Sequence, residues 1–408
     1  MKKSLLIMGA ALMMLGAVSC SGGDGAVNKD LTDREVLTLI YEQMNGAKWA
    51  EDTAGWCSDK PLSEWEGVEA ETIDGVERVV GLKLNDDSLK GNIPAEIVNL
   101  TELKELSFYT RAYDADITNA VPAGIFSMAK LEDLRLFIHG KGHYTLPTEM
   151  NLPAIKQLHI TRAEGPFDVL CNLTTLEELQ MFNFKGAIPE NIGNLANLET
   201  LWWETSEDPQ GRVPASINKL SKLEHIQIDY TNGIAGGVKA ADAPFPVEVW
   251  DIPTLQYVFL RCVASQPSTL PAEKIAAMKE LKNVTIIDCG IEGTIPAEMF
   301  TSPKLYSFSI YRCNLTGEIP AAIGNCPELS TINLSYNKLS GTIPATIGKC
   351  TKLFTLSLED NAELGGSLPA SLASCEKLSM FSVKNTKVSQ DVPAALKSHA
   401  NFSKWRLF

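Results

Sequence analysis

Motifs that indicate enzymatic chemistry are missing from this sequence of 408 residues. It contains no His-Glu-x-x-His helix, no Gly-x-Ser-x-Gly turn and no glycine-rich phosphate loop before a helix. Histidine is scarce, with only His139, His143, His159, His225 and His399 present. His139 and His143 have a generic spacing, so we interpret them as solvated loop residues rather than metal ligands. We therefore expect no catalysis, no cofactor and no metal.

Positive charge is also in short supply. The chain has 36 Lys and Arg residues against 50 Asp and Glu, for a formal net charge of −14. An acidic chain without a basic stripe is a poor ligand for nucleic acid or for an anionic membrane surface. Cys-x-x-Cys is absent, which argues against zinc. We interpret the acid excess as a source of solubility, and the pairs Asp86-Asp87 and Glu359-Asp360 as solvated charge rather than calcium ligands.

The sequence does contain a ladder of prolines, most of them preceded by a branched apolar residue. From Pro271 to Pro393 the steps are 25, 24, 24, 25 and 24 residues. A period in this range predicts stacked supersecondary units, because one unit cannot bury its apolar face alone. We therefore predict one elongated solenoid of about thirteen units instead of two or three globular domains.

One unit, residues 329–348, shows what each position does. Ile332 and Leu334 alternate with Asn333, which is the pattern of a short strand with one buried face. Asn337 follows the strand and offers both a donor and an acceptor to backbone groups that would otherwise be buried without partners. The pattern predicts a strand, an asparagine turn and a convex return in each unit.

The second half of this unit, Leu-x-Gly-x-Ile-Pro-x-x-Ile-Gly from Leu339 to Gly348, resembles the plant-type leucine-rich repeat. The resemblance covers residues 81–396. It implies an α/β repeat solenoid, curved, with a parallel sheet on its concave side and an N-terminal helical cap over residues 31–80. The first half is less regular: two units of 21 residues fit between Pro147 and Pro189, and a longer step holds an insertion near residues 232–243.

The two ends differ from the repeats. Residues 1–19 combine a basic start with an apolar run, which indicates a secretory leader. Val18-Ser19-Cys20 resembles a bacterial lipoprotein processing box, which implies cleavage before Cys20 and lipid on its sulfur. Ordinary secretion is the alternative. We expect residues 20–30 to be a flexible tether and residues 397–408 to fold back over the last repeat as a tail.

The cysteines fit the repeat better than a disulfide framework. Cys326, Cys350 and Cys375 recur at positions where other units have Leu, and Cys289 and Cys313 occupy the position of Asn337. We expect all five to be buried as small apolar residues, with disulfide or metal roles as the alternative. The cap of plant-type repeats carries paired cysteines, but Cys57 has no close sequence partner, so its disulfide stays open.

The register also predicts which strand residues face the concave side. Large rings and arginines, the side chains that dominate binding hot spots, gather there in the first two thirds of the array. The candidate ligand-binding residues are Tyr109, Phe137, His159, Arg162, Phe182, Trp202, Tyr230, Phe259, Arg261, Tyr311 and Arg312. The alternative is that these rings pack against one another as sheet neighbours.

The predicted function is non-enzymatic recognition by a monomer, an outer-membrane lipoprotein that binds a host or bacterial protein through a rigid concave face. Whether it faces the periplasm or the cell surface stays open. Glycan capture on rings such as Trp202 and Tyr230 is the second interpretation, and a catalytic module is the third. Contact with a membrane is expected only through lipid at Cys20, and none is expected with nucleic acid.

Overall fold

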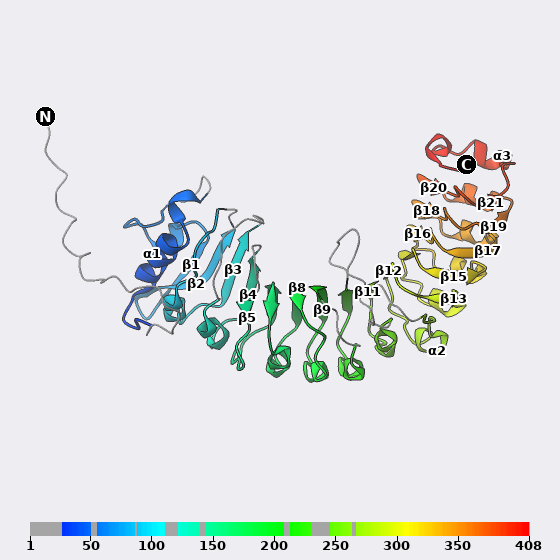
Figure 1. Ribbon diagram of the computed structural model, residues 1–408. Coiled ribbons are helices and arrows are strands. Elements are labelled where there is room, and N and C mark those ends of the chain that lie inside the picture. Colours follow the sequence, from blue (N-terminus) through cyan, green and yellow to red (C-terminus); the bar gives the residue numbers. More distant parts are fainter. Residues whose placement is uncertain are drawn as a thin grey trace, which may run out of the picture.

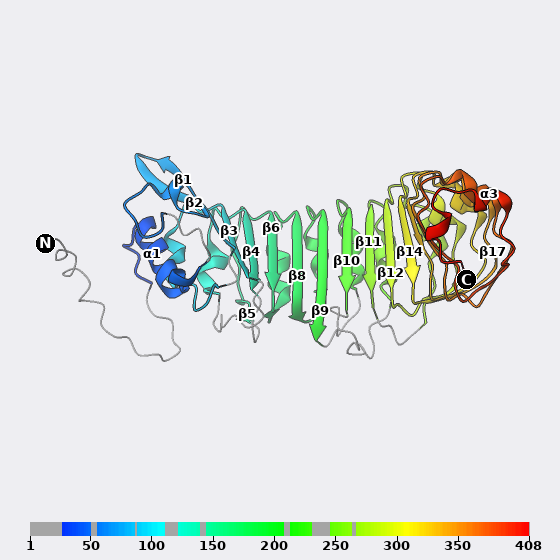
Figure 2. The ribbon, with the colours of Figure 1, turned by 90° about the horizontal axis from the view of Figure 1, so that it is seen from above.

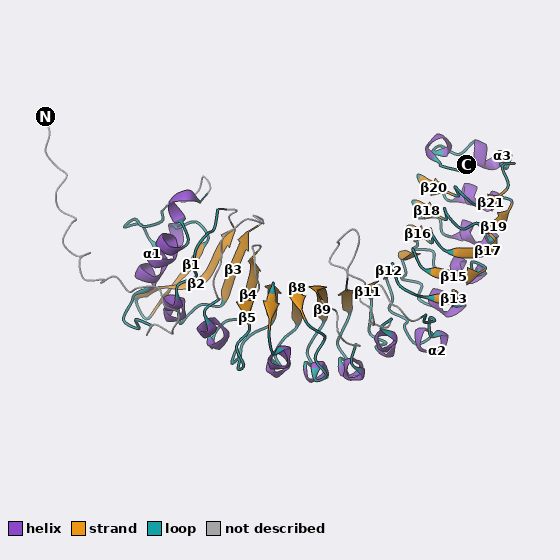
Figure 3. Cartoon of the chain, viewed as in Figure 1, coloured by secondary structure: helices purple, strands orange, loops and turns teal. Residues whose placement is uncertain are grey.

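A computed structural model shows the chain as one curved array, with strands along its inner side and short helices along its outer side (Figures 1 and 3). Viewed from above, the strands lie side by side along the array (Figure 2). The structure describes residues 27–49, 55–85, 88–110, 121–138, 144–207, 213–230, 245–262 and 267–407. The predicted curved solenoid with a parallel concave sheet is confirmed.

Several sequence-based expectations lie outside the described residues. They are the leader, Cys20, most of the tether, the insertion at residues 232–243, and the residues His139, His143, Asp86 and Asp87.

The concave sheet carries the array. Within the described residues it has fourteen strands, in the order β1-β2-β3-β4-β6-β8-β9-β10-β11-β12-β14-β16-β18-β20. Only β1 and β2 pair antiparallel; each later strand pairs in parallel with the strand before it. The bounds are β1 Val68–Ile73, β2 Val76–Asn85, β3 Glu105–Thr110, β4 Asp133–Ile138, β6 Gln157–Thr161, β8 Glu178–Lys185, β9 Thr200–Glu207, β10 His225–Asp229, β11 Tyr257–Arg261, β12 Asn283–Ile287, β14 Ser307–Tyr311, β16 Thr331–Asn333, β18 Thr355–Ser357 and β20 Met380–Ser382.

Prolines begin most of the short outer helices. The carbonyls of Pro94, Pro320 and Pro344 accept hydrogen bonds from the backbone N–H three residues later, at 3.2, 3.0 and 3.0 Å. Proline suits this place because its φ is preset. It also lacks a backbone N–H, which would have no partner within the helix at a helix start. The outer helices of the repeats are η3 Ala95–Asn99, η4 Ala123–Ser127, η5 Phe167–Asn172, η6 Ile192–Asn194, η7 Ala215–Lys219, η8 Val247–Asp251, α2 Ala272–Ile275, η9 Ala297–Phe300, η10 Ala321–Asn325, η11 Ala345–Lys349, η12 Ala370–Ser374 and α3 Ala394–Lys397.

A second, outer sheet runs along the C-terminal repeats. In the described part of the chain its strands are β13 Glu292–Thr294, β15 Asn314–Gly317, β17 Lys338–Thr342, β19 Glu363–Gly366 and β21 Lys387–Val388, all parallel. Further towards the N-terminus, the described residues add one short outer pair, β5 Tyr144–Thr145 with β7 Ala163–Glu164. The C-terminal repeats are thus joined by backbone hydrogen bonds on two sides.

Asparagines hold the turns of the most regular repeats. The Asn361 amide is fully buried and donates to the carbonyls of Leu334 and Leu358, both at 2.9 Å. Its Oδ1 accepts from the N–H of Leu339 at 3.0 Å. Asn337 makes the same kind of bonds one repeat earlier. These side chains therefore pair buried backbone groups, as the sequence predicts.

The N-terminal end of the array is covered by α1 Asp33–Gln43, which Thr32 and Glu35 cap reciprocally. The helix buries Val36, Leu37 and Ile40. The short helices η1 Gly46–Lys48 and η2 Leu62–Glu64 follow it. This cover shields the apolar edge of the first repeat from water.

At the C-terminal end, η13 Phe402–Lys404 leads the chain back over the last repeat. Trp405 packs on Phe381 with ring centroids 5.2 Å apart, and its Nε1 donates to the Leu378 carbonyl at 3.2 Å. The N–H of Arg406 donates to the Phe381 carbonyl at 2.7 Å. The final residues therefore close the open end of the sheet.

The five repeat cysteines predicted to be buried are buried, which confirms that expectation. Cys57 is exposed and has no disulfide partner among the residues that the structure describes. A further buried cysteine, Cys262, lies directly after β11.

Candidate functional site

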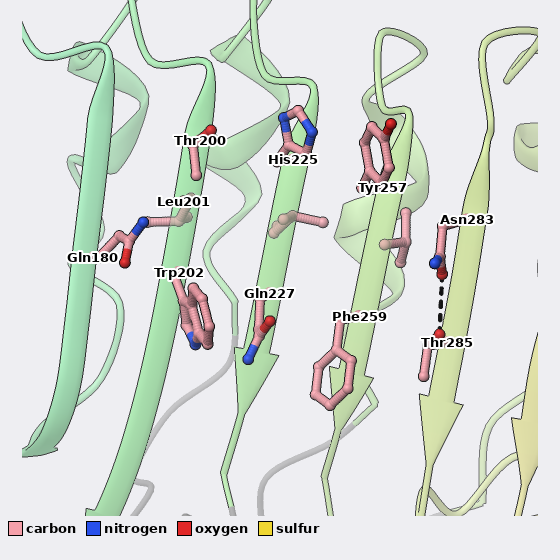
Figure 4. A pocket seen from close by; sticks show the side chains of 12 residues that line it. Gln180, Thr200, Leu201, Trp202, His225, Gln227, Tyr257, Phe259, Asn283 and Thr285 are labelled. Carbon is pink, nitrogen blue, oxygen red and sulfur yellow. Dashed lines mark hydrogen bonds between the residues drawn. The ribbon is translucent and has the colours of Figure 1, made fainter. Parts of the chain in front are cut away.

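A depression of about 400 Å³ lies on the concave sheet where β9, β10, β11 and β12 run side by side (Figure 4). Its lining side chains come from the strands themselves, with one contribution from β8. They are Gln180, Thr200, Leu201, Trp202, His225, Ile226, Gln227, Tyr257, Val258, Phe259, Asn283 and Thr285. Because regular strands position them, these groups are held in place before any ligand arrives.

The concave side chains form two rows across the strands. Register pairs His225 with Tyr257 and Tyr257 with Asn283 in the first row. Two residues later on the same strands, Gln227 pairs with Phe259 and with Trp202 in the second row. Both rows face the same way because side chains alternate between the two faces of a strand. The second row thus places an amide between two rings, as Figure 4 shows.

The lining carries no Asp, Glu, Lys or Arg side chain. Its titratable groups are His225 and Tyr257, whose rings stack at 4.2 Å with an interplanar angle of 14°. Burial lowers the pKa of His225, so the imidazole is neutral near pH 7. In a chain with 86 charged side chains, 36 basic and 50 acidic, this depression is an uncharged surface of rings, amides and hydroxyls.

Charged residues border the depression. The Arg261 guanidinium lies 5.7 Å from the centroid of the Phe259 ring, and its Nη2 is 3.0 Å from a carboxylate oxygen of Asp229. Glu204, on β9, faces the same side as Asp229 on β10. Burial raises the pKa of Glu204, the Asp229 carboxylate raises it further, and the Trp202 indole and Arg261 lower it by less. The border therefore holds a carboxyl that resists ionisation.

Glu204→Gln is expected to raise the melting midpoint at pH 7. The folded protein holds the Glu204 proton more tightly than the unfolded chain does, so wild-type stability falls as pH rises from about 4.3 through the raised folded pKa. The neutral amide removes that loss, and the two proteins should converge near pH 4. Thermal unfolding across this pH range measures the difference. Glu199→Gln, at an exposed carboxylate, is the control; an equal gain at pH 4 and pH 7 would contradict the assignment.

The structure divides the predicted ligand-binding residues into groups. Trp202 and Phe259 line the depression, and Arg261 borders it. The rings of Tyr109, Phe137, Phe182 and Trp202 form a row along the sheet, with successive centroids 5.8, 5.5 and 4.8 Å apart. Packing between sheet neighbours, the alternative interpretation of these rings, is therefore present. The row leads directly to the depression.

His159 has the predicted concave register but is buried, with 6% of its surface exposed. Its Nε2 lies 3.2 Å from a carboxylate oxygen of Glu178, and this contact lowers the pKa of Glu178. Its ring also packs edge-on against Phe137 at 5.7 Å. His159 thus supports the neighbouring rings from below the surface.

The prediction that Tyr230 faces the concave solvent is wrong. Only 5% of its surface is exposed, and burial raises the pKa of its phenol. Its N–H donates to the carbonyl of Arg261 at 2.8 Å, which extends the pairing of β10 with β11 by one residue. Tyr230 therefore continues the alternation of Ile226 and Ile228 and points inward.

Three further candidates lie outside the lining of the depression. Arg162 follows β6 in a left-handed conformation, with φ of 59°, and is half-buried. Tyr311 ends β14, and Arg312 follows it with φ of 53°. The Arg312 guanidinium lies 5.8 Å from the exposed ring of Tyr336. Arg162, Tyr311 and Arg312 therefore lie at the ends of strands and not in the depression.

Sequence reasoning missed the first row, Thr200, His225, Tyr257 and Asn283. Each of them lies two residues before a member of the second row on the same strand. The alternation of side chains that selected Trp202 and Phe259 could therefore have found them. Gln180, Gln227 and Thr285 share the strand position of Trp202 and Phe259 but were not among the predicted ligand-binding residues.

In the described part of the chain, no group of three or more His, Cys, Asp or Glu side chains is arranged to hold a metal ion. Nor does this part of the chain contain a helix with the length and apolar character needed to cross a bilayer.

Comparison with known proteins points to the leucine-rich-repeat class. The profile of the Leucine Rich Repeat family matches residues 304–326 and 328–350. A search of curated proteins found no significant sequence match.

Solved structures with the same architecture come from plants and bacteria. The plant peptide hormone receptor RGFR1 in complex with RGF2 has a TM-score of 0.56 and 24% identity over 84% of this chain and 52% of that chain. The Arabidopsis receptor kinase HAESA, in complex with the peptide hormone IDA and the co-receptor SERK1, has a TM-score of 0.61 and 21% identity over 89% of this chain and 67% of that chain.

A leucine-rich-repeat protein of Leptospira interrogans has a TM-score of 0.59 and 22% identity, covering 80% of this chain and 83% of that one. By contrast, the chain spans about half the length of the plant receptor RGFR1. At these identities the likeness shows the fold, a leucine-rich-repeat array.

Proposed function

We propose that this chain is a non-enzymatic recognition protein that binds a protein partner through its concave face. The observation that carries the proposal is the uncharged depression on β9–β12, in which Trp202 and Phe259 stand on rigid strands. A few hot-spot residues carry most of the binding energy of a protein interface, and large aromatic side chains such as Trp are enriched among them. A pre-formed array also spares the ordering cost that a flexible binder has to meet.

Two further observations favour a protein or peptide ligand. The ring row from Tyr109 to Trp202 extends the apolar surface over several repeats, which suits an elongated partner. Two plant receptors of the same fold are seen with peptide hormones bound, which supports a peptide or protein ligand by analogy of fold alone.

We also propose that the protein is a monomeric bacterial lipoprotein of the outer membrane, built from plant-type repeats and held by lipid at Cys20. The supports are the basic and apolar leader, the Val18-Ser19-Cys20 sequence and the Leu-x-Gly-x-Ile-Pro motif. Several acyl chains on one cysteine would hold a protein stably at a membrane. Loss of the protein from intact cells treated with protease tests exposure at the surface.

Trp202→Ala and Phe259→Ala are each expected to weaken partner binding about 30-fold, since a hot-spot ring contributes about 2 kcal/mol. The partner is first captured with the wild-type chain, and affinities are then measured by titration. Phe354→Ala is the matched control, because Phe354 is an exposed ring outside the depression, with 46% of its surface exposed. Unchanged affinity in both depression variants, with the fold intact, would remove this site.

Glycan binding is the second candidate function, and one observation favours it. Trp202, Gln227 and Phe259 alternate ring, amide and ring in a single row, and no charge lies among them. Flat rings cover sugar faces while amides and hydroxyls bond sugar hydroxyls. Competition of the captured partner by free neutral oligosaccharide would favour this function, whereas competition by peptide alone would favour the first.

A further inference from the structure

Two cysteines of neighbouring repeats lie in direct contact. The sulfur atoms of Cys262 and Cys289 are 3.0 Å apart, although the residues are 27 positions apart in sequence. Cys262 follows β11 and Cys289 follows β12, and the register that pairs Arg261 with Ile287 leaves the two cysteines one position away from directly opposite each other. Neighbouring strands run about 4.8 Å apart, and disulfides span Cα separations of about 4.4–6.8 Å, so this diagonal pair is close enough for its sulfurs to meet.

The surroundings also fit a covalent link. Cys262 and Cys289 are 0% and 2% exposed. The backbone N–H of Cys262 donates to the sulfur of Cys289 at 3.3 Å, and the carbonyl of Ile287 lies 3.3 Å from the same sulfur. Both thiols are therefore fixed side by side in an apolar layer, and little backbone movement separates them from bonding distance.

Other repeat cysteines do not show this geometry. Cys350 and Cys375 occupy equivalent positions in successive repeats, yet the sulfur of each lies near a backbone carbonyl, Ile323 at 3.6 Å and Ile347 at 3.7 Å. Stacking of equivalent positions is thus not enough to bring two sulfurs together. The contact between Cys262 and Cys289 is specific to the β11–β12 step.

We propose that Cys262 and Cys289 form a disulfide that joins the two repeats beside the depression. The donor is a disulfide, either a small-molecule disulfide such as oxidised glutathione or a disulfide-transferring protein. One cysteine thiolate attacks the donor, giving a mixed disulfide and one donor thiol. The second thiolate then displaces the other donor thiol. Two electrons pass from the cysteine pair to the donor, which leaves as two thiols carrying the two protons.

The link would act on the wall of the depression. Tyr257 and Phe259 lie on β11, and Asn283 and Thr285 lie on β12. A bond immediately after these strands fixes their relative position. Because both sulfurs are buried, we expect the bond to form during folding and to resist reductant once the repeats have stacked.

The test uses the full chain produced in an oxidising compartment, followed by alkylation of free thiols in denaturant and non-reducing peptide mapping. We expect a linked peptide that contains Cys262 and Cys289. Cys289→Ser should abolish it, while Cys350→Ser should leave it intact. The oxidised wild-type protein should also melt at a higher temperature than the reduced protein, and Cys262→Ser should show no such difference.

The mapping of the wild-type chain decides the proposal without any variant. Complete alkylation of both cysteines in protein from the oxidising compartment would overturn it. So would a link from Cys289 to Cys313, the next cysteine in the same column. None of these outcomes depends on the ligand, so they leave the proposed binding function untouched.

Discussion

Replacing Trp203 by alanine is expected to lower the free energy of unfolding by about 3–5 kcal/mol. The indole is fully buried, and its ring packs edge-on against Phe184 at 4.7 Å and Phe167 at 5.9 Å. Truncation removes these contacts and leaves a cavity that a stacked array fills only in part. Denaturant titration monitored by circular dichroism measures the loss.

Trp202→Ala is the matched control for this variant, because the neighbouring residue has the same side chain on the opposite face of β9. Trp202 is half-buried and faces the depression. We expect its truncation to destabilise the fold much less while weakening ligand binding. If Trp202→Ala were the more destabilising of the two, the assignment of the faces of β9 would be wrong.

Asn361→Ala is expected to cost about 3 kcal/mol of stability. The change leaves the N–H of Leu339 and the carbonyls of Leu334 and Leu358 without the amide that pairs them. Each buried backbone group without a partner costs about 1–3 kcal/mol. Thermal and denaturant unfolding of the variant measure the total.

Two variants control for the loss of the amide. Asn314→Ala removes an exposed amide on β15 and is expected to change stability by less than about 0.5 kcal/mol. Asn361→Cys should be intermediate, because Cys289 and Cys313 already occupy this position and a thiol pairs backbone only weakly. Equal stability of Asn361→Ala and Asn314→Ala would contradict a structural role for the asparagine.

The fold could be predicted because the same pattern of apolar residues, asparagine or cysteine, and proline recurs along the sequence. Each unit supplies an alternating strand such as Ile332 to Leu334, and the period places the next unit beside it. The role of Asn337 followed from the need to pair buried backbone groups, and the structure shows those bonds. Regular spacing therefore determined which faces of the strands are buried.

The candidate site was only partly predictable. Trp202 and Phe259 were found because each lies between two buried apolar residues of its strand. A depression, however, needs two rows of side chains on four strands, and its outline depends on the size of every neighbouring side chain. Tyr230 was misplaced because its position directly after β10 was assigned to the concave face, whereas its backbone pairing with Arg261 carries the alternation of the strand one residue further. Whether Tyr230 faces inward or towards the concave side depends on where the strand pairing ends, and the sequence pattern does not show that point.

The outer sheet has a mechanical consequence for the depression. From β13 onwards, hydrogen bonds join neighbouring repeats along two separate lines, so the angle between those repeats is hard to change. Around β9–β11 the described outer elements are short helices, and the concave strands there pair over five residues each, against three between β14 and β20. A ligand on β9–β12 therefore contacts the part of the array whose described backbone pairing between repeats lies on the side that the ligand covers.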